Sequence, residues 1–166
     1  MSVKNVFVVM LALLMLPFFA GAETVDVVTL KIGDGPDEVG ASTPDKAVGD
    51  FVGPTAFTLA PDGSLYLLDA PKFCVKIFSR EGKPVRSIPY PAKTAEGKPI
   101  LGIDLAVGPG GDLFVANATQ GLIWKFDAKG KLAATFGRTE RGARLFGLLH
   151  RIAVDSRGNL LAGEGM

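Results

Sequence analysis

The sequence lacks most of the side chains that build metal centres and disulfide frameworks. Its 166 residues include one cysteine, Cys74, and one histidine, His150. One cysteine excludes an intrachain disulfide, and a dedicated zinc site takes several cysteine or histidine ligands. The chain also has no Cys-x-x-Cys-His haem site and no His-Glu-x-x-His motif. These absences exclude a dedicated zinc site and a covalently attached haem. Cys74, between apolar neighbours, is expected to be a buried, inert thiol.

An excess of charge and a helical periodicity are missing as well. The chain has 18 Lys and Arg against 17 Asp and Glu, a formal net charge of +1. Nucleic-acid binding depends on surplus basic charge, so this balance excludes binding of that kind. No segment sustains a 3.6-residue apolar period, and the glycine-rich run 108–111 therefore has no helix behind it to hold a phosphate.

The one long apolar run lies at the N-terminus. Lys4 precedes an apolar stretch over 6–19, and Ala20-Gly21-Ala22 supplies the small residues of a signal-peptidase site. We interpret residues 1–22 as a cleaved signal peptide, because the run is short for a membrane span and no second one follows. The protein is then exported to a periplasm or exterior, with no membrane span after cleavage. The lack of disulfides favours a bacterial source.

A motif occurs three times in the remaining chain. It is present as Pro61–Asp69, Pro109–Asn117 and, more loosely, Ser156–Glu164, with spacings of 48 and 47 residues. A fixed period of this size indicates an array of similar units, each of which buries its apolar faces against its neighbours. The repeats decide the fold class before any single residue does.

Each repeat reads as short strands joined by tight glycine turns. The expected strands are 57–60, 65–69, 75–79 and 85–88 in the first repeat and 105–107, 113–117, 123–127 and 132–136 in the second. Four short antiparallel strands are the unit of a β-propeller blade. We therefore predict an all-β fold, an incomplete propeller of about two and a half blades, within 53–166. Blade 1 spans 53–100, blade 2 spans 101–147 and a partial blade 3 spans 148–166.

The repeats resemble a known family at two segments. Val75–Lys83 and Ile152–Leu160 are similar to the two halves of an NHL-type propeller repeat. This resemblance covers residues 53–166, although 69–73 depart from the family's usual polar turn. It implies a six-bladed propeller, in a family that ranges from binding scaffolds to lyases and lactonase-like hydrolases. It also implies calcium as a candidate cofactor of the full-length protein; no other cofactor is expected.

The segment before the first blade gives a second indication of a ring. Val27–Gly33 resembles Leu132–Gly137, the outermost strand of the second repeat, so 23–52 is predicted to hold an orphan outer strand and a connection. Such a strand completes the last blade of a closed propeller. Because propellers close with about 4–8 blades, we expect an N-terminal fragment of a longer propeller, or a chain that closes by self-association.

The long connections between blades are the predicted binding face. They span 33–52, 89–102 and 137–149, and irregular segments on a rigid scaffold commonly carry binding groups. Aligned repeats place Ala56, Asp104 and Arg151 at one equivalent position. Asp104 and Arg151 then form either an inter-blade ion pair or, with His150, a polar rim for a ligand.

A second equivalent set ends the second strand of each repeat. Asp69 and Asn117 are predicted to hold the turn that follows them, whereas the role of Glu164 stays open. The candidate ligand-binding residues are therefore Asp104, His150, Arg151 and Glu164. No catalytic or metal-ligating residue is identified.

Three functional hypotheses follow. The leading one is a non-catalytic exported propeller that binds a protein, peptide or glycan on its connection face. The second is part of a metal-dependent propeller enzyme, a lactonase-like hydrolase or lyase. The third is a fragment without independent activity, in which several apolar side chains are poorly covered: Phe57, Leu65, Tyr66, Phe114 and Trp124.

Overall fold

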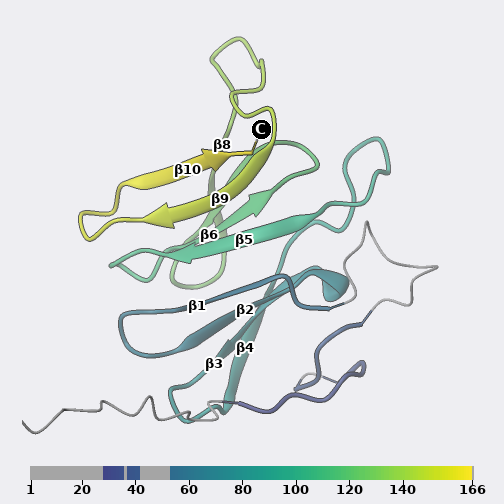
Figure 1. Cartoon of the computed structure of the whole chain (residues 1–166), viewed down its shortest axis with the longest axis vertical. Coiled ribbons are helices and arrows are strands. Elements are labelled where there is room, and N and C mark those ends of the chain that lie inside the picture. Colours follow the sequence, from purple (N-terminus) through teal and green to yellow (C-terminus); the bar gives the residue numbers. More distant parts are fainter. Residues whose placement is uncertain (1–27, 36, 42–52, 166) are drawn as a thin grey trace, which may run out of the picture.

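The structure is a computed structural model that describes residues 28–35, 37–41 and 53–165. Its strands follow one another along the chain in three antiparallel sheets (Figure 1). The predicted signal peptide, 1–22, lies outside the described residues. Within the described ranges no helix is long and apolar enough to cross a membrane.

Each sheet corresponds to one repeat. Blade 1 contains β1 (Ala56–Leu59), β2 (Leu65–Asp69), β3 (Cys74–Phe78) and β4 (Pro84–Pro89). Blade 2 contains β5 (Gly102–Val107), β6 (Leu113–Asn117), β7 (Leu122–Phe126) and β8 (Leu132–Phe136). The two-stranded blade 3 contains β9 (Leu149–Val154) and β10 (Leu160–Glu164). A short 3₁₀ turn, η1 (Ala70–Lys72), joins β2 to β3. The predicted all-β fold of four-stranded antiparallel units is confirmed.

The hairpin turns between the first two strands of each blade are built alike. Gly63, Gly111 and Gly158 have φ of 84°, 80° and 85°. Glycine adopts this left-handed conformation without the steric cost that a Cβ brings. The three hairpins turn at the same end of the sheets, on the left in Figure 1. The connections that enter blades 2 and 3 therefore start from the opposite side.

The core consists of two layers, one between each pair of neighbouring blades. Because side chains alternate across a strand, every blade has one face toward the preceding blade and one toward the following blade. Leu68, Val75 and Ile77 of blade 1 pack against Leu105, Val115 and Trp124 of blade 2. Phe114, Ala116 and Ile123 of blade 2 pack against Leu149 and Ile152 of blade 3.

The expected apolar exposure is correct at one residue and wrong at four. Phe57 is 71% exposed, but Leu65, Tyr66, Phe114 and Trp124 are all buried. Tyr66, Phe114 and Trp124 lie in the two layers, where a neighbouring blade covers them. Blade stacking therefore protects more of this chain than the strand count alone suggests.

The described part of the predicted orphan strand does not pair with any blade. Residues 28–33 contain an isolated parallel bridge between Ile32 and Val39 and no named strand. Their backbone groups bond within their own loop, from Gly33 N–H to the carbonyl of Val39 and from Val39 N–H to the carbonyl of Lys31. Residues 28–35 and 37–41 lie against blade 1, and we call them the N-terminal loop. Val27, where the predicted strand begins, is outside the described residues.

Candidate functional site

Strand register confirms the repeat alignment at the connection end of the inner strands. Ala56 is opposite Leu68, Asp104 is opposite Ala116, and Arg151 is opposite Gly163. In each blade the cross-strand partner is the residue before the last of the second strand. The three positions are therefore structurally equivalent, as the spacing predicts.

Asp104 bridges two blades, although its partner is a backbone group. Its Oδ2 accepts a hydrogen bond of 2.9 Å from the N–H of Ile152, and its Oδ1 accepts one of 3.0 Å from the N–H of Leu105. The predicted Asp104–Arg151 ion pair is not formed; the salt bridge within the described ranges joins Lys125 to Asp112 at 2.7 Å. The reason is strand alternation. Ile152 faces blade 2, so the exposed Arg151 side chain lies on the opposite face of β9.

The residues at the ends of β2, β6 and β10 make hydrogen bonds that stabilise the fold. Asn117 is fully buried, and its amide bonds both the backbone N–H and the side chain of Gln120, at 3.2 and 2.9 Å. The role predicted for Asn117, to hold the turn that follows it, is confirmed. Glu164 Oε1 accepts a hydrogen bond from the N–H of Gly147 in the connection before β9.

Asp69 reaches further than the turn beside it. Both of its carboxylate oxygens accept hydrogen bonds from the N–H of Gly40, at 3.1 and 3.0 Å. Burial raises the pKa of Asp69, and the backbone N–H groups of Gly40 and Lys72 oppose that rise. Asp69 therefore anchors the N-terminal loop as well as contacting the turn that follows it.

The same arrangement occurs where the chain enters each blade. Asp69 holds Gly40 ahead of blade 1, and Glu164 holds Gly147 ahead of blade 3. In blade 2 the role passes to Thr119, whose hydroxyl accepts from Leu101 N–H and donates to the carbonyl of Pro99. A polar side chain at or just after the end of the second strand thus holds the incoming connection in all three blades.

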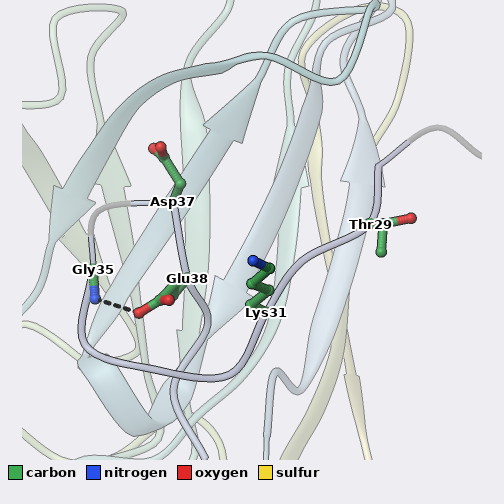
Figure 2. A pocket seen from close by; sticks show the side chains of 5 residues that line it. All are labelled: Thr29, Lys31, Gly35, Asp37 and Glu38. Atoms are coloured by element: carbon green, nitrogen blue, oxygen red, sulfur yellow. Dashed lines mark hydrogen bonds between the residues drawn. The ribbon is translucent and has the colours of Figure 1, made fainter.

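The N-terminal loop borders an open hollow that the sequence does not predict. Figure 2 shows it lined by Thr29, Lys31, Gly35, Asp37 and Glu38, with a volume of about 450 Å³. The Lys72 ammonium holds the loop in place by donating to the carbonyls of Gly35 and Glu38, at 3.1 and 2.9 Å. Glu38 accepts from Gly35 N–H at 2.8 Å. No sequence motif pointed to this loop, because its anchors lie more than 30 residues away along the chain.

Of the predicted ligand-binding residues, two remain available to a partner. Asp104 is 7% exposed and Glu164 is hydrogen-bonded, whereas His150 and Arg151 are both exposed. The adjoining connection over 137–148 presents further exposed side chains, among them Arg141, Leu145 and Leu148. Within the described residues, the connection end of blade 3 therefore exposes arginine and leucine side chains, together with the carboxylates of Glu140 and Glu164.

The described residues do not fit a calcium site or a reactive thiol. No three His, Cys, Asp or Glu side chains in the described ranges gather closely enough to hold a metal ion. Asp104 and Glu164, the candidate carboxylates, already accept backbone hydrogen bonds. Cys74 is buried, and burial raises the pKa of its thiol. The inert thiol expected from the sequence is in keeping with this environment.

Comparisons with known proteins give the fold. The chain matches no protein-family model and no curated protein. Hydrazine synthase of Kuenenia stuttgartiensis is similar in structure, with a TM-score of 0.53 and 17% identity over 67% of this chain and 29% of that one. Virginiamycin B lyase of Staphylococcus aureus matches with a TM-score of 0.49 and 16% identity, over 74% of this chain and 36% of that one.

These similarities concern architecture alone. At 17% identity, the similarity to hydrazine synthase shows a shared fold. The chain spans about a third of the length of the propeller proteins it matches. The NHL family is not established by them. With its two four-stranded blades and one two-stranded blade, the chain is an incomplete β-propeller.

Proposed function

We propose that this protein is an exported binding module that holds a protein or peptide on the connection end of its blades. The observation that carries the proposal is the exposed surface over 137–151, where Arg141 and Arg151 lie close in sequence to Leu145 and Leu148. Exposed leucine among arginine side chains suits a segment with acidic and apolar residues, because Arg pairs with carboxylates and leucine buries apolar surface. A glycan remains the alternative ligand class.

The scaffold under this surface is rigid. Glu164 holds Gly147, and Arg138 donates to the carbonyls of Gln120 and Gly137 at 2.9 and 3.0 Å. Leu149, at the end of the connection, is 1% exposed in the layer against blade 2. A preformed surface loses little conformational entropy when it binds, which favours recognition over an unstructured loop.

The test uses a synthetic probe. A fluorescein-labelled peptide of alternating glutamate and leucine is titrated with the purified chain, and fluorescence anisotropy measures its dissociation constant. We expect the double variant R141A/R151A to bind at least about tenfold more weakly, and added salt to weaken binding by the wild type. Arg157 is exposed in the β9–β10 turn at the other end of the blade, so R157A is the matched control.

Two outcomes would contradict the proposal. One is an unchanged dissociation constant in R141A/R151A, and the other is equal weakening by R157A. Binding of a neutral oligosaccharide in place of the peptide would move the ligand class to glycans. Export is tested separately by the N-terminal sequence of the protein in a periplasmic fraction, which should begin at Glu23.

A further inference from the structure

The two ends of the blade stack expose complementary halves of the contact that joins blades inside it. Phe57, Leu105 and Ile152 are equivalent residues of β1, β5 and β9, one in each repeat. Leu105 and Ile152 are 4% and 7% exposed, because each packs against the blade before it. Phe57 is 71% exposed, and no blade precedes it in the described residues.

The far end of the stack shows the opposite pattern. Tyr66, Phe114 and Leu161 are equivalent residues of β2, β6 and β10. Tyr66 and Phe114 are 9% and 5% exposed in the layers against the following blade, whereas Leu161 is 55% exposed. Figure 1 shows the β9–β10 hairpin at the end of the stack opposite blade 1.

Only part of the outward face of blade 1 is open. On the outward face of blade 1, Phe57 and Leu59 of β1 are exposed, but Lys76 and Phe78 of β3 are 3% and 1% exposed. The N-terminal loop lies on that side, since Asp37 lines a hollow together with Lys76 and Phe78. Leu65, which faces the same way in β2, is 8% exposed. The open part of this face is therefore confined largely to β1, and the opposite face of the chain is the two-stranded β9–β10 hairpin.

From these positions we infer a head-to-tail interface between two copies of this chain, in which the β9–β10 hairpin of one copy packs on β1 of the next. Phe57 and Leu59 would occupy the place that Leu105 and Val107 take inside the stack. Leu161, with the small side chain of Ala153 opposite it, would take the place of Tyr66 in that layer. The contact is heterologous, because the two surfaces differ, and it extends the stack by one copy at a time.

The test uses two variants that each remove one surface. In sedimentation velocity over a concentration series, the wild-type chain associates reversibly, while F57R and L161R each remain monomeric alone. Mixed together, F57R and L161R form a one-to-one heterodimer and nothing larger, because the mixture contains one intact pair of surfaces. Phe57 and Leu161 are already exposed, so both variants should fold, which circular dichroism checks. L132R, at an exposed position of β8, is the control and associates like the wild type.

Several results would overturn the inference. They are a wild-type chain that is monomeric at every concentration, association that persists in F57R or in L161R, and a mixture that contains no heterodimer. Arg151 lies opposite Gly163 on the same face of the hairpin, so the interface and the connection surface over 137–151 share this residue. F57R separates the two proposals, because Phe57 lies in blade 1 and outside the connection surface. Loss of association in F57R supports the interface, and peptide binding that F57R retains and R141A/R151A loses supports the connection surface.

Discussion

Asp104 in blade 2 accepts a hydrogen bond of 2.9 Å from the backbone N–H of Ile152 in blade 3. It is a buried carboxylate, and its second oxygen is used by the N–H of Leu105. The contact fixes the inner strand of one blade to the inner strand of the next, at the end where the connections enter. Blade 3 depends on it more than a complete blade would, because two strands bury less apolar surface than four.

Replacing Asp104 by alanine should loosen blade 3. The D104A variant leaves the Ile152 N–H without its acceptor, and we expect a loss of about 1–3 kcal/mol in the free energy of unfolding. Amide hydrogen exchange should show the Ile152 N–H exchanging faster, ahead of the amides of β6. R151A should change the free energy of unfolding by no more than about 0.5 kcal/mol. Equal losses of unfolding free energy in D104A and R151A would indicate an Asp104–Arg151 ion pair and contradict the structure.

Tyr90 carries a hydroxyl that the fold does not satisfy. It is the buried side-chain group without a hydrogen-bond partner in the described part of the chain, and burial raises the pKa of this phenol. We expect Y90F to raise the free energy of unfolding by about 1 kcal/mol, because an unpaired buried polar group is costly. The ring keeps its contacts with Phe73 and Trp124.

Gly102 provides an internal check on the same hydroxyl. A Cβ at this position would lie 2.7 Å from Tyr90 Oη, so G102A should be destabilising in thermal unfolding. In a Y90F background the same change should cost less, and a double-mutant cycle measures the difference. Additive effects would show that the two groups are not in contact.

Phe73 and Gly121 are equivalent residues, since each directly precedes the third strand of its blade, and both have a positive φ. Gly121 has φ of 60°, and a Cβ there would lie 2.7 Å from the carbonyl oxygen of Phe146. G121A should therefore lose at least about 1–2 kcal/mol and shift the connection before β9. Phe73 takes the same left-handed conformation, at φ 53°.

The change from Phe73 to glycine removes strain and packing together. It removes backbone strain of about 1–2 kcal/mol. It also loses the edge contact with Tyr90, about 0.5–1.5 kcal/mol, and up to about 1.5–3 kcal/mol from a ring that is partly buried against the core. F73G should therefore lose about 1–2 kcal/mol in urea unfolding, and a variant more stable than the wild type would mean that the strain outweighs the packing.

Asp69 links stability to pH. Because burial raises its pKa in the folded state, the folded chain binds its proton more tightly than the unfolded chain does. Asp69 thus favours folding most below its unfolded pKa, near 3.8, and this contribution is lost as pH rises through the folded pKa. D69N should remove that part of the pH dependence of stability. Asparagine is already present at the equivalent position of blade 2, as Asn117. D69A should lose about 1–3 kcal/mol, because Gly40 N–H loses its acceptor. An unchanged pH profile in D69N would contradict the shift.

The sequence predicts the blades well and the contacts between them less well. Strands 65–69, 113–117 and 132–136 follow from glycine turns and apolar alternation, which are local, and the structure has the same bounds. The equivalence of Ala56, Asp104 and Arg151 also follows, because a fixed period carries register with it. A repeat array is informative in this way because every unit faces the same packing problem.

The parts that sequence reasoning missed depend on long-range geometry. The choice of Ile152 N–H over the Arg151 side chain as the partner of Asp104 depends on which face of β9 meets blade 2. The N-terminal loop depends on contacts of Lys72 and Asp69 with residues about 30 positions earlier. No local pattern of residue types encodes either contact.

The central claim is that successive repeats stack face to face, so that equivalent residues differ in exposure only by their place in the stack. The measurement is the rate of thiol alkylation in the variants F57C, L105C and I152C, each in a C74A background, at low protein concentration. We expect F57C to react at least about tenfold faster than the other two, whose thiols react only when a blade opens. Equal rates in the three variants, or slowest reaction in F57C, would contradict the stacked arrangement.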